Sequence, residues 1–374
     1  MSFGVAAALL LALVPVVVGA VAWVRAAAFW RRPQRQAGPP GHVLVVRPLA
    51  GADALLSPAH PRATCWFAVA DRDDAAFPAA EAACAALRAA GSDAEVVLTG
   101  GDRGLPNHKA AQLAFCLERA GDRFDVLVCA DGDVELEALE PLLAPLRWGA
   151  AATWAPPVET GAAASFGDRA SHALLGGSLH AFPLLAGIDP RGLVGKLFAV
   201  RVEPLRRIGG FEALARYLGE DMELARRLLA VGERIEAVPL RARSLVAGRS
   251  LASVADRYHR WMLVVRGQRP HLLASYPLLF APLPGIVLLG LAAGSAEAIL
   301  LGVAGRWLTA LAARHVAHGS FAPLDAAVDA ILADALLLAA LVRALVSRQL
   351  AWRGRRLSLA RDGTLQVSRE PRPW

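Results

Sequence analysis

Residues 126–133 read VLVCADGD, and this segment gives the clearest indication of the fold. Its five apolar residues fit a strand that is buried on both faces, and an acidic turn follows them directly. Similar apolar runs lie upstream at residues 42–46, 66–70 and 94–98, and they are separated by helical stretches at 78–90 and 109–119. Apolar strands that alternate with helices predict a parallel sheet with helices covering both faces.

Polar side chains stand at the point where these predicted strands end. Arg47 follows the first strand, Asp71 the second, and Asp131 the strand at 126–130. In open sheets of this kind, ligands bind beyond the carboxyl ends of the strands. The sequence therefore predicts a binding site at that edge of the sheet.

The composition narrows the class of protein. The chain has 374 residues, 55% hydrophobic and 20% charged, with a mean hydropathy of +0.41. A disordered chain is excluded, because such chains combine low hydrophobicity with high charge. The hydrophobic fraction and the mean hydropathy are also higher than is usual for a soluble domain. A net charge of +7 suits nucleic acid, anionic lipid or a phosphate-bearing substrate equally well. The four cysteines lack C-x-x-C spacing, so we expect reduced thiols in a cytosolic domain.

Membrane segments are expected at both ends. Residues 5–24 form an apolar run of about the length that spans a bilayer. Arginines follow this run and none precedes it, which favours an uncleaved anchor with the remaining chain entering the cytoplasm. Further apolar segments lie at 276–291, 296–311 and 326–345, and Arg306 makes the middle one the weakest. A basic tail predicts an even number of C-terminal spans, so three candidates leave the topology open.

Two acidic pairs are candidates for chemistry. Asp131 and Asp133 flank Gly132 at a turn, which suits a hard divalent cation such as Mg²⁺ or Mn²⁺, although many such turns are simply solvated. Glu220 and Asp221 begin a helical stretch, where the helix dipole stabilises acids and lowers their pKa. A role for Asp221 as a general base therefore requires a desolvated setting.

Basic residues are candidates for phosphate contacts. Arg257 and Arg260 share a helix face beside Trp261, which fits either a membrane-surface belt or a clamp for a diphosphate.

Asp71 and Asp74 either bind a nucleotide or cap the next helix. The only lysines of this arginine-rich chain are Lys109 and Lys196, and the only asparagine is Asn107. We expect Lys109 to neutralise a phosphate and Asn107 to position its loop.

The order of these motifs resembles that of membrane-bound family 2 glycosyltransferases. Their series D, DxD, (E)D and (Q/R)xxRW is matched here by Asp71 or Asp74, Asp131-x-Asp133, Glu220-Asp221 and Arg257-x-x-Arg260-Trp261. Finer features are similar to the ceramide glucosyltransferase branch and its bacterial relatives that glycosylate hopanoids. These features are VVRPLAGAD (45–53), FAVADRDDAAF (67–77), Asn107-x-Lys109, VGKLFAVRVEPLRRIGGFEAL (194–214) and WRGRR (352–356).

The resemblance implies an α/β GT-A (Rossmann-like) domain that uses a UDP-sugar donor and a divalent cation, Mg²⁺ or Mn²⁺. Asp131 and Asp133 would hold the metal, and Asp221, with Glu220 beside it, would be the base. The residues expected to bind the nucleotide-sugar are Asp71, Asp74, Asn107, Lys109, Asp131, Arg257, Arg260 and Trp261. Residues 153–193 lie where the acceptor would be recognised, and this segment resembles no family segment that can be identified.

This resemblance also organises the chain. The expected parts are an N-terminal transmembrane anchor (1–32), a linker (33–41), a cytoplasmic catalytic domain (42–249), an interfacial helix (250–270), a C-terminal transmembrane bundle (271–346) and a basic cytoplasmic tail (347–374). The expected activity is inverting transfer of one sugar, glucose, to a ceramide-like or hopanoid lipid at a bacterial inner membrane. The expected partners are the donor, the lipid and the bilayer, and no nucleic acid. The alternatives are a processive polysaccharide synthase and a catalytically inactive membrane scaffold.

Overall fold

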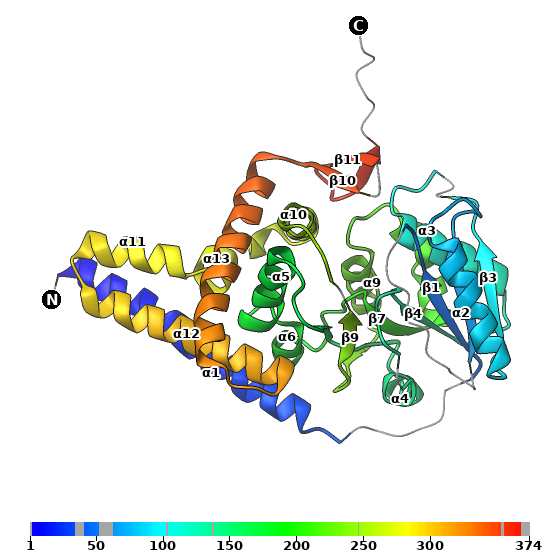
Figure 1. The fold of residues 1–374 in the computed structure, drawn as a ribbon, viewed down its shortest axis with the longest axis horizontal. Coiled ribbons are helices and arrows are strands. Elements are labelled where there is room, and N and C mark those ends of the chain that lie inside the picture. Colours follow the sequence, from blue (N-terminus) through cyan, green and yellow to red (C-terminus); the bar gives the residue numbers. More distant parts are fainter. Residues whose placement is uncertain are drawn as a thin grey trace, which may run out of the picture. The chain divides into compact units, whose positions relative to one another are not determined.

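The computed structural model describes residues 2–33, 41–51, 63–101, 104–136, 138–245, 247–352 and 355–367 (Figure 1). The chain forms two compact units, each interrupted in sequence. The α/β unit comprises Pro33–Pro157, Pro190–Leu245 and Trp352–Trp374, and the helical unit comprises Met1–Arg32, Val158–Asp189 and Val246–Ala351. Most of the expected linker at 33–41, together with Asp53 and Arg353, lies outside the described residues.

The α/β unit is built on one sheet with the strand order β3-β2-β1-β4-β7-β5-β8. Its strands are β1 (Val43–Pro48), β2 (Thr64–Val69), β3 (Ala94–Leu98), β4 (Val126–Ala130), β5 (Ala152–Trp154), β7 (Leu197–Arg201) and β8 (Ile235–Ala237). The first four are mutually parallel, which confirms the predicted α/β class with a parallel sheet. Val45, Phe67 and Val128 are fully buried in its core.

Strand β7 runs antiparallel to both of its neighbours, so the sheet is mixed rather than wholly parallel. Leu197, its first residue, pairs with Ala130, the last residue of β4. The backbone N–H of Asp131 donates to the carbonyl of Lys196 at 3.0 Å. The entrance to β7 therefore lies beside the acidic turn that follows β4.

Helices complete the α/β unit. They are α2 (Phe77–Ala89), α3 (His108–Ala120), α4 (Glu140–Arg147), α7 (Val202–Arg207), α8 (Gly210–Leu214) and α9 (Glu220–Ala230). The helices predicted at 78–90 and 109–119 are confirmed within one residue at each end. The remaining strands of the chain are β6 (Pro157–Thr160), β9 (Ala242–Leu245), β10 (Gln349–Trp352), β11 (Arg355–Leu359) and β12 (Leu365–Val367).

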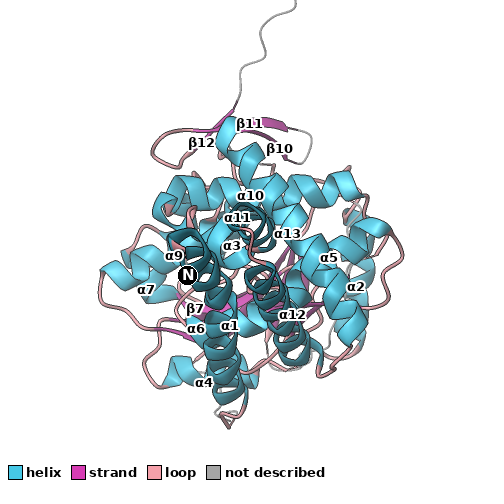
Figure 2. Ribbon diagram, turned by 90° about the vertical axis from the view of Figure 1, so that its left-hand side faces the viewer, coloured by secondary structure: helices cyan, strands magenta, loops and turns pink. Residues whose placement is uncertain are grey.

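The helical unit consists of packed helices. They are α1 (Phe3–Trp30), α5 (Phe166–Gly177), α6 (Phe182–Ile188), α10 (Leu251–Gln268), η1 (Pro270–Leu272), η2 (Tyr276–Phe280), α11 (Leu283–Ala293), α12 (Ala296–His318) and α13 (Pro323–Val346). Figures 1 and 2 show α1, α11 and α12 side by side. Small residues allow this approach, because a Cβ at Gly19 would lie 2.4 Å from Thr309 Oγ1 and one at Gly305 would lie 2.4 Å from Val16 Cγ2.

Two described helices, α1 and α12, are long and apolar enough to cross a membrane. The pair Pro270–Phe280 and Leu283–Ala293, bent by 65°, forms a third such span if it is counted as one. The ranking in the sequence analysis is thus wrong for 296–311, because α12 passes this test and α13 does not. Arg306 is buried against Asp334 at 2.8 Å, so its charge is paired within the protein. Helix α13 carries Asp325, Asp329 and Asp334, which lower its suitability as a span.

Candidate functional site

A buried arginine binds the backbone of the Asp131-Gly132-Asp133 turn. Arg47, the fifth residue of β1, has no exposed surface. Its Nη2 donates to the carbonyls of Asp131 at 2.8 Å, Gly132 at 3.1 Å and Val134 at 2.6 Å. The guanidinium therefore fixes the backbone of the turn.

Four acids and two lysines gather around this turn, and we call them the acid–lysine cluster: Asp131, Asp133, Glu220, Asp221, Lys109 and Lys196. Lys109 Nζ lies 2.7 Å from Asp131 Oδ1 and 3.6 Å from Glu220 Oε1. Burial alone would lower the pKa of Lys109, but Asp131 beside it raises that pKa well above its usual value. Lys109 therefore stays charged and joins the strand-end acid to the first turn of α9.

Lys196 contacts both acids of the turn. Its Nζ lies 2.6 Å from Asp133 Oδ2, 2.7 Å from Asp133 Oδ1 and 3.5 Å from Asp131 Oδ2. Ser244, in β9, donates its hydroxyl to Asp133 at 2.6 Å. Asp133 is thus oriented by two side chains that come 63 and 111 positions after it in the sequence.

Asp221 lies in the desolvated setting that a general base requires. Its Oδ2 accepts the Gly195 N–H and its Oδ1 accepts the Met222 N–H, each at 2.7 Å. Burial, and next to it the Glu220 carboxylate, raise the pKa of Asp221 to about 6. A Cβ at Gly195 would stand 3.0 Å from Asp221 Oδ2, so this close approach favours glycine. The helix dipole is therefore outweighed by burial and by the like charge.

Asn107 links the loop before α3 to α9. Its Oδ1 accepts the Ala110 N–H, which caps the helix, and its Nδ2 donates to Glu220 Oε2 and to the Tyr217 carbonyl, both at 2.9 Å. The side chain is fully buried. This amide suits the position because it accepts at the helix terminus and donates to a carboxylate.

Asp71 and Asp74 shape the loop after β2. Asp71 Oδ1 accepts the N–H groups of Asp73 and Asp74, at 2.9 and 3.0 Å. Asp74 Oδ1 accepts those of Gly51 at 2.8 Å and Ala76 at 2.9 Å. Asp74 therefore ties the loop after β1 to the loop after β2, and both acids have a clear local role at the carboxyl edge of the sheet.

The donor set of the turn fits a hard divalent cation. The described residues contain no group of three or more His, Cys, Asp and Glu side chains arranged to hold a metal. Asp131 and Asp133 supply carboxylate oxygens, the ligands that Mg²⁺ and Mn²⁺ prefer. A site with two protein carboxylates keeps its other positions for water or for phosphate oxygens.

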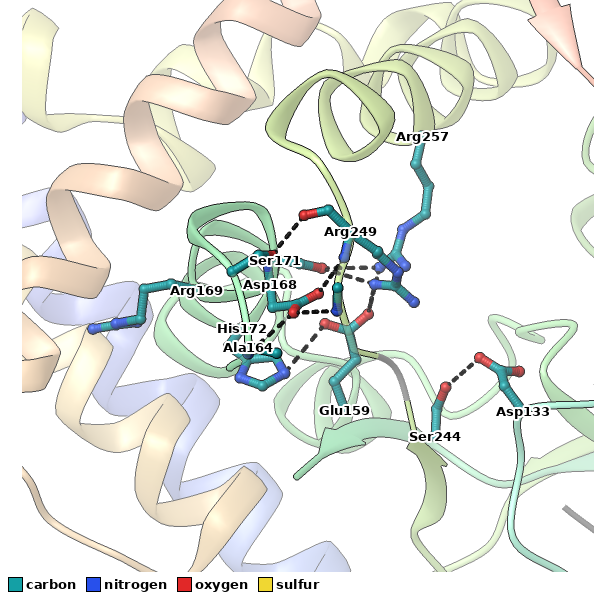
Figure 3. Close-up of polar contacts among 12 residues, drawn as sticks. Asp133, Glu159, Ala164, Asp168, Arg169, Ser171, His172, Ser244, Arg249 and Arg257 are labelled. Atoms are coloured by element: carbon teal, nitrogen blue, oxygen red, sulfur yellow. Dashed lines mark hydrogen bonds and ion pairs between the residues drawn. The ribbon is translucent and has the colours of Figure 1, made fainter. Parts of the chain in front are cut away.

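The Arg257 region belongs to the helical unit, where it forms a second charged group, the arginine–glutamate cluster: Glu159, Arg249 and Arg257. Glu159 Oε1 lies 2.8 Å from Arg257 Nη2 and 2.5 Å from Arg249 Nη1. Figure 3 shows both guanidinium groups directed at this carboxylate. Burial alone would raise the pKa of Glu159, but Arg257 and Arg249 lower it to about 2, so Glu159 is charged.

Trp261 packs among aromatic side chains of the same unit. Its ring stacks on His180 at 5.7 Å and meets Phe182 at 5.5 Å and Tyr258 at 5.1 Å edge-on. Arg257 lies over its ring, 5.3 Å from the centroid. Arg260, three residues after Arg257 in α10, is partly exposed. The predicted grouping of Arg257 with Trp261 is therefore present.

Five residues at the two clusters were given no role from the sequence: Lys196, Gly195, Ser244, Glu159 and Arg249. Only Lys196 could have been found from the sequence, because lysine is rare in this chain. The chain has only two lysines, and both lie in the acid–lysine cluster. Glu159 lies in the 153–193 region that resembles nothing identifiable, and Arg249 lies 90 residues away from it. No local pattern indicates that pair.

The chain belongs to glycosyl transferase family 21, whose family model matches residues 7–365. It is therefore a glycosyltransferase, as the motif order predicts. No curated protein matches its sequence. Among solved structures, it is similar to a mannosyltransferase from Pyrobaculum calidifontis in complex with GDP-Man and Mn²⁺, with 18% identity, a TM-score of 0.49, and coverage of 92% of this chain and 99% of that one. It is also similar to S. aureus TarS 1-349 in complex with UDP-GlcNAc, with 11% identity, a TM-score of 0.36, and coverage of 89% and 98%.

Proposed function

We propose that this protein is an inverting glycosyltransferase that moves one sugar, glucose, from a UDP-sugar to the hydroxyl of a ceramide-like or hopanoid lipid. The observation that carries the proposal is the position of Asp221, a partly buried carboxylate with a raised pKa, in the same cluster as Asp131 and Asp133. A base and a diphosphate site must be neighbours in any enzyme that transfers a sugar to a hydroxyl group.

Asp221 would act on the acceptor. Its carboxylate takes the proton of the acceptor hydroxyl while the hydroxyl oxygen bonds to the anomeric carbon, and the bond from that carbon to the diphosphate breaks, releasing UDP. One displacement inverts the configuration at that carbon. A general base contributes about 10²–10⁴-fold to such a step. Glu220 holds Lys109 and Asn107 beside the base.

The donor would lie along the carboxyl edge of the sheet. Asp131 and Asp133 would hold a divalent cation, Mg²⁺ or Mn²⁺, and the chemistry that cation supplies when bound is stabilisation of the leaving diphosphate. Lys109 contributes a fixed positive charge to the same region. Asp71 or Asp74 would contact the uridine, and Asn107 keeps the loop before α3 in place.

Arg257, Arg260 and Trp261 would bind the donor diphosphate. The guanidinium group of arginine matches the geometry of a phosphate group. The packing of the Trp261 ring against its aromatic neighbours fixes the face of α10 that carries the two arginines. We further propose that α1 and α12 anchor the protein in a bacterial inner membrane with the α/β unit in the cytoplasm. Membrane anchoring brings the enzyme to a lipid acceptor.

A transfer assay tests the proposal. Purified full-length protein in detergent is incubated with Mn²⁺, a panel of UDP-sugars, and ceramide or hopanoid lipids, and the products are read by mass spectrometry. The expected result is one added hexose on a lipid, absent with Asp221→Asn and retained with Asp122→Asn, an exposed acid outside the cluster. A polymer product supports the synthase instead, and no metal-dependent turnover of any UDP-sugar contradicts the proposal.

A further inference from the structure

Both lysines of the chain lie in one small cluster. The sequence holds 40 lysine and arginine residues, of which only Lys109 and Lys196 are lysines. Both contact Asp131, and each also contacts a second acid of the cluster. Arginine serves as the cation elsewhere in the chain, so these two positions share a requirement that arginine does not meet.

The contacts of Lys196 show what that requirement is. Its ammonium reaches both oxygens of Asp133 and one oxygen of Asp131. A compact point charge fits between two carboxylates, whereas the planar guanidinium of arginine pairs side by side with one. The Lys196 ammonium thus contacts both carboxylates that suit a divalent cation.

The two lysines differ in how they are held. Lys109 is enclosed by Asp131, Glu220 and the Gly195 carbonyl, and 13% of its side chain is exposed. For Lys196 the exposed fraction of the side chain is 27%, and its ammonium contacts the two acids of the turn. Its flexible four-carbon stem lets the ammonium leave this position without moving the backbone. Lys196 is therefore the more readily displaced cation of the two.

We propose that Lys196 is an internal counter-cation of Asp131 and Asp133 that competes with the divalent cation and gives way to it when a donor diphosphate arrives. The inference rests on the proposed function, in which these acids hold the metal. A divalent cation binding alone must displace the ammonium from both carboxylates with no new partner for it. A metal–diphosphate complex brings phosphate oxygens that the displaced ammonium can bind. Lys196 would thereby make metal binding depend on the donor.

Mn²⁺ binding measured without any sugar transfer tests this role. The unbound Mn²⁺ signal is titrated by electron paramagnetic resonance, with and without UDP, on full-length protein in detergent. The variants are Lys196→Gln, Lys196→Met as a second neutral replacement, and Lys196→Arg, which keeps the charge. Arg206→Gln is the matched control, because it removes one positive charge from an exposed ion pair in the same unit.

The expected result is that both neutral variants bind Mn²⁺ alone about tenfold tighter than wild type, since a repelling charge within a few ångströms is removed. UDP tightens Mn²⁺ binding in wild type and does so less in these variants. Arg206→Gln binds Mn²⁺ alone as wild type does, and Lys196→Arg, which keeps the charge but pairs with one carboxylate only, falls between wild type and the neutral variants. Neutral variants whose Mn²⁺ affinity equals that of wild type, or is weaker, overturn the role of Lys196.

A further variant separates this inference from the proposed function. Asp131→Asn should abolish the tightened Mn²⁺ binding when combined with Lys196→Gln. Mn²⁺ binding that survives in this double variant overturns the metal site and the role of Lys196 together. Mn²⁺-dependent sugar transfer by wild type, with equal Mn²⁺ affinities in the single variants, leaves the proposed function intact and overturns only the role of Lys196.

Discussion

The two charged clusters are opposite in composition. In the acid–lysine cluster four carboxylates face two lysines, whereas in the arginine–glutamate cluster one carboxylate faces two arginines. A buried charge without a partner is costly, so each cluster gains from a ligand of the missing sign. The first suits a divalent cation and the second suits a phosphate group.

The largest effect is expected from Asp221→Asn, which keeps the shape of the side chain and removes the base. Turnover should fall by about 10²–10⁴-fold, because a general base contributes that much. The affinity for a UDP-sugar should stay near wild type, since Asp131 and Asp133, the acids proposed to hold the metal, are untouched. Steady-state kinetics with a separate donor-binding titration measures both. An equal loss of turnover and donor affinity would place Asp221 in donor binding instead.

Arg257→Gln tests the cationic half of the comparison. Removing a charged hydrogen-bond donor to a phosphate costs about 1.5–3 kcal/mol, which is roughly a ten- to hundredfold rise in the donor KM. Glu159→Gln is the matched change, because it removes the carboxylate that Arg257 contacts and keeps the guanidinium. The rise should be smaller in Glu159→Gln. Unchanged donor kinetics in Arg257→Gln would leave Arg257 a role in the packing of α10 alone.

The pH profile follows from the raised pKa of Asp221, about 6. Below that pH the carboxyl is protonated and cannot accept a proton, so kcat/KM should fall about tenfold per pH unit. Above it the base is ionised and the profile should be flat until another group titrates. Measuring kcat/KM from pH 5 to pH 8 checks the position of this limb. A profile without an acidic limb in this range argues against Asp221 as the base.

The smallest effect is expected at Asn107, whose side chain both caps α3 and binds Glu220. Asn107→Ala should lower the free energy of unfolding by about 0.5–2 kcal/mol through loss of the cap. Asn107→Ser keeps an oxygen for the cap but cannot donate to Glu220 in the same way, so it should recover part of this loss. Denaturant unfolding in detergent measures both variants. Equal stability of all three proteins would show that the cap contributes nothing.

Local pattern was sufficient for the first half of the α/β unit. Apolar runs and the helical stretches between them place β1 to β4, α2 and α3 within two residues, because each element is decided by its own side chains. The acids at the strand ends follow from the same pattern, since parallel strands end at one edge. These parts of the site are readable from short segments.

The rest depends on pairings between distant segments. Lys196 meets Asp133 across 63 positions because β7 runs antiparallel to β4, and Glu159 meets Arg257 across 98 positions. The presence of Arg306 made the segment 296–311 rank too low, because the sequence alone does not reveal that this charge is paired with Asp334. Periodicity identifies which faces are apolar, but it does not identify which buried charges meet.

The most direct test of the account is a calorimetric titration of UDP with and without Mn²⁺, on wild type and on Asp131→Asn. If the acid–lysine cluster binds a metal–diphosphate complex, Mn²⁺ should tighten UDP binding to wild type by about tenfold or more, as a divalent cation bridging the two does. The same addition should leave UDP binding to Asp131→Asn unchanged. Equal UDP affinity in wild type with and without Mn²⁺ would contradict the assignment of this cluster.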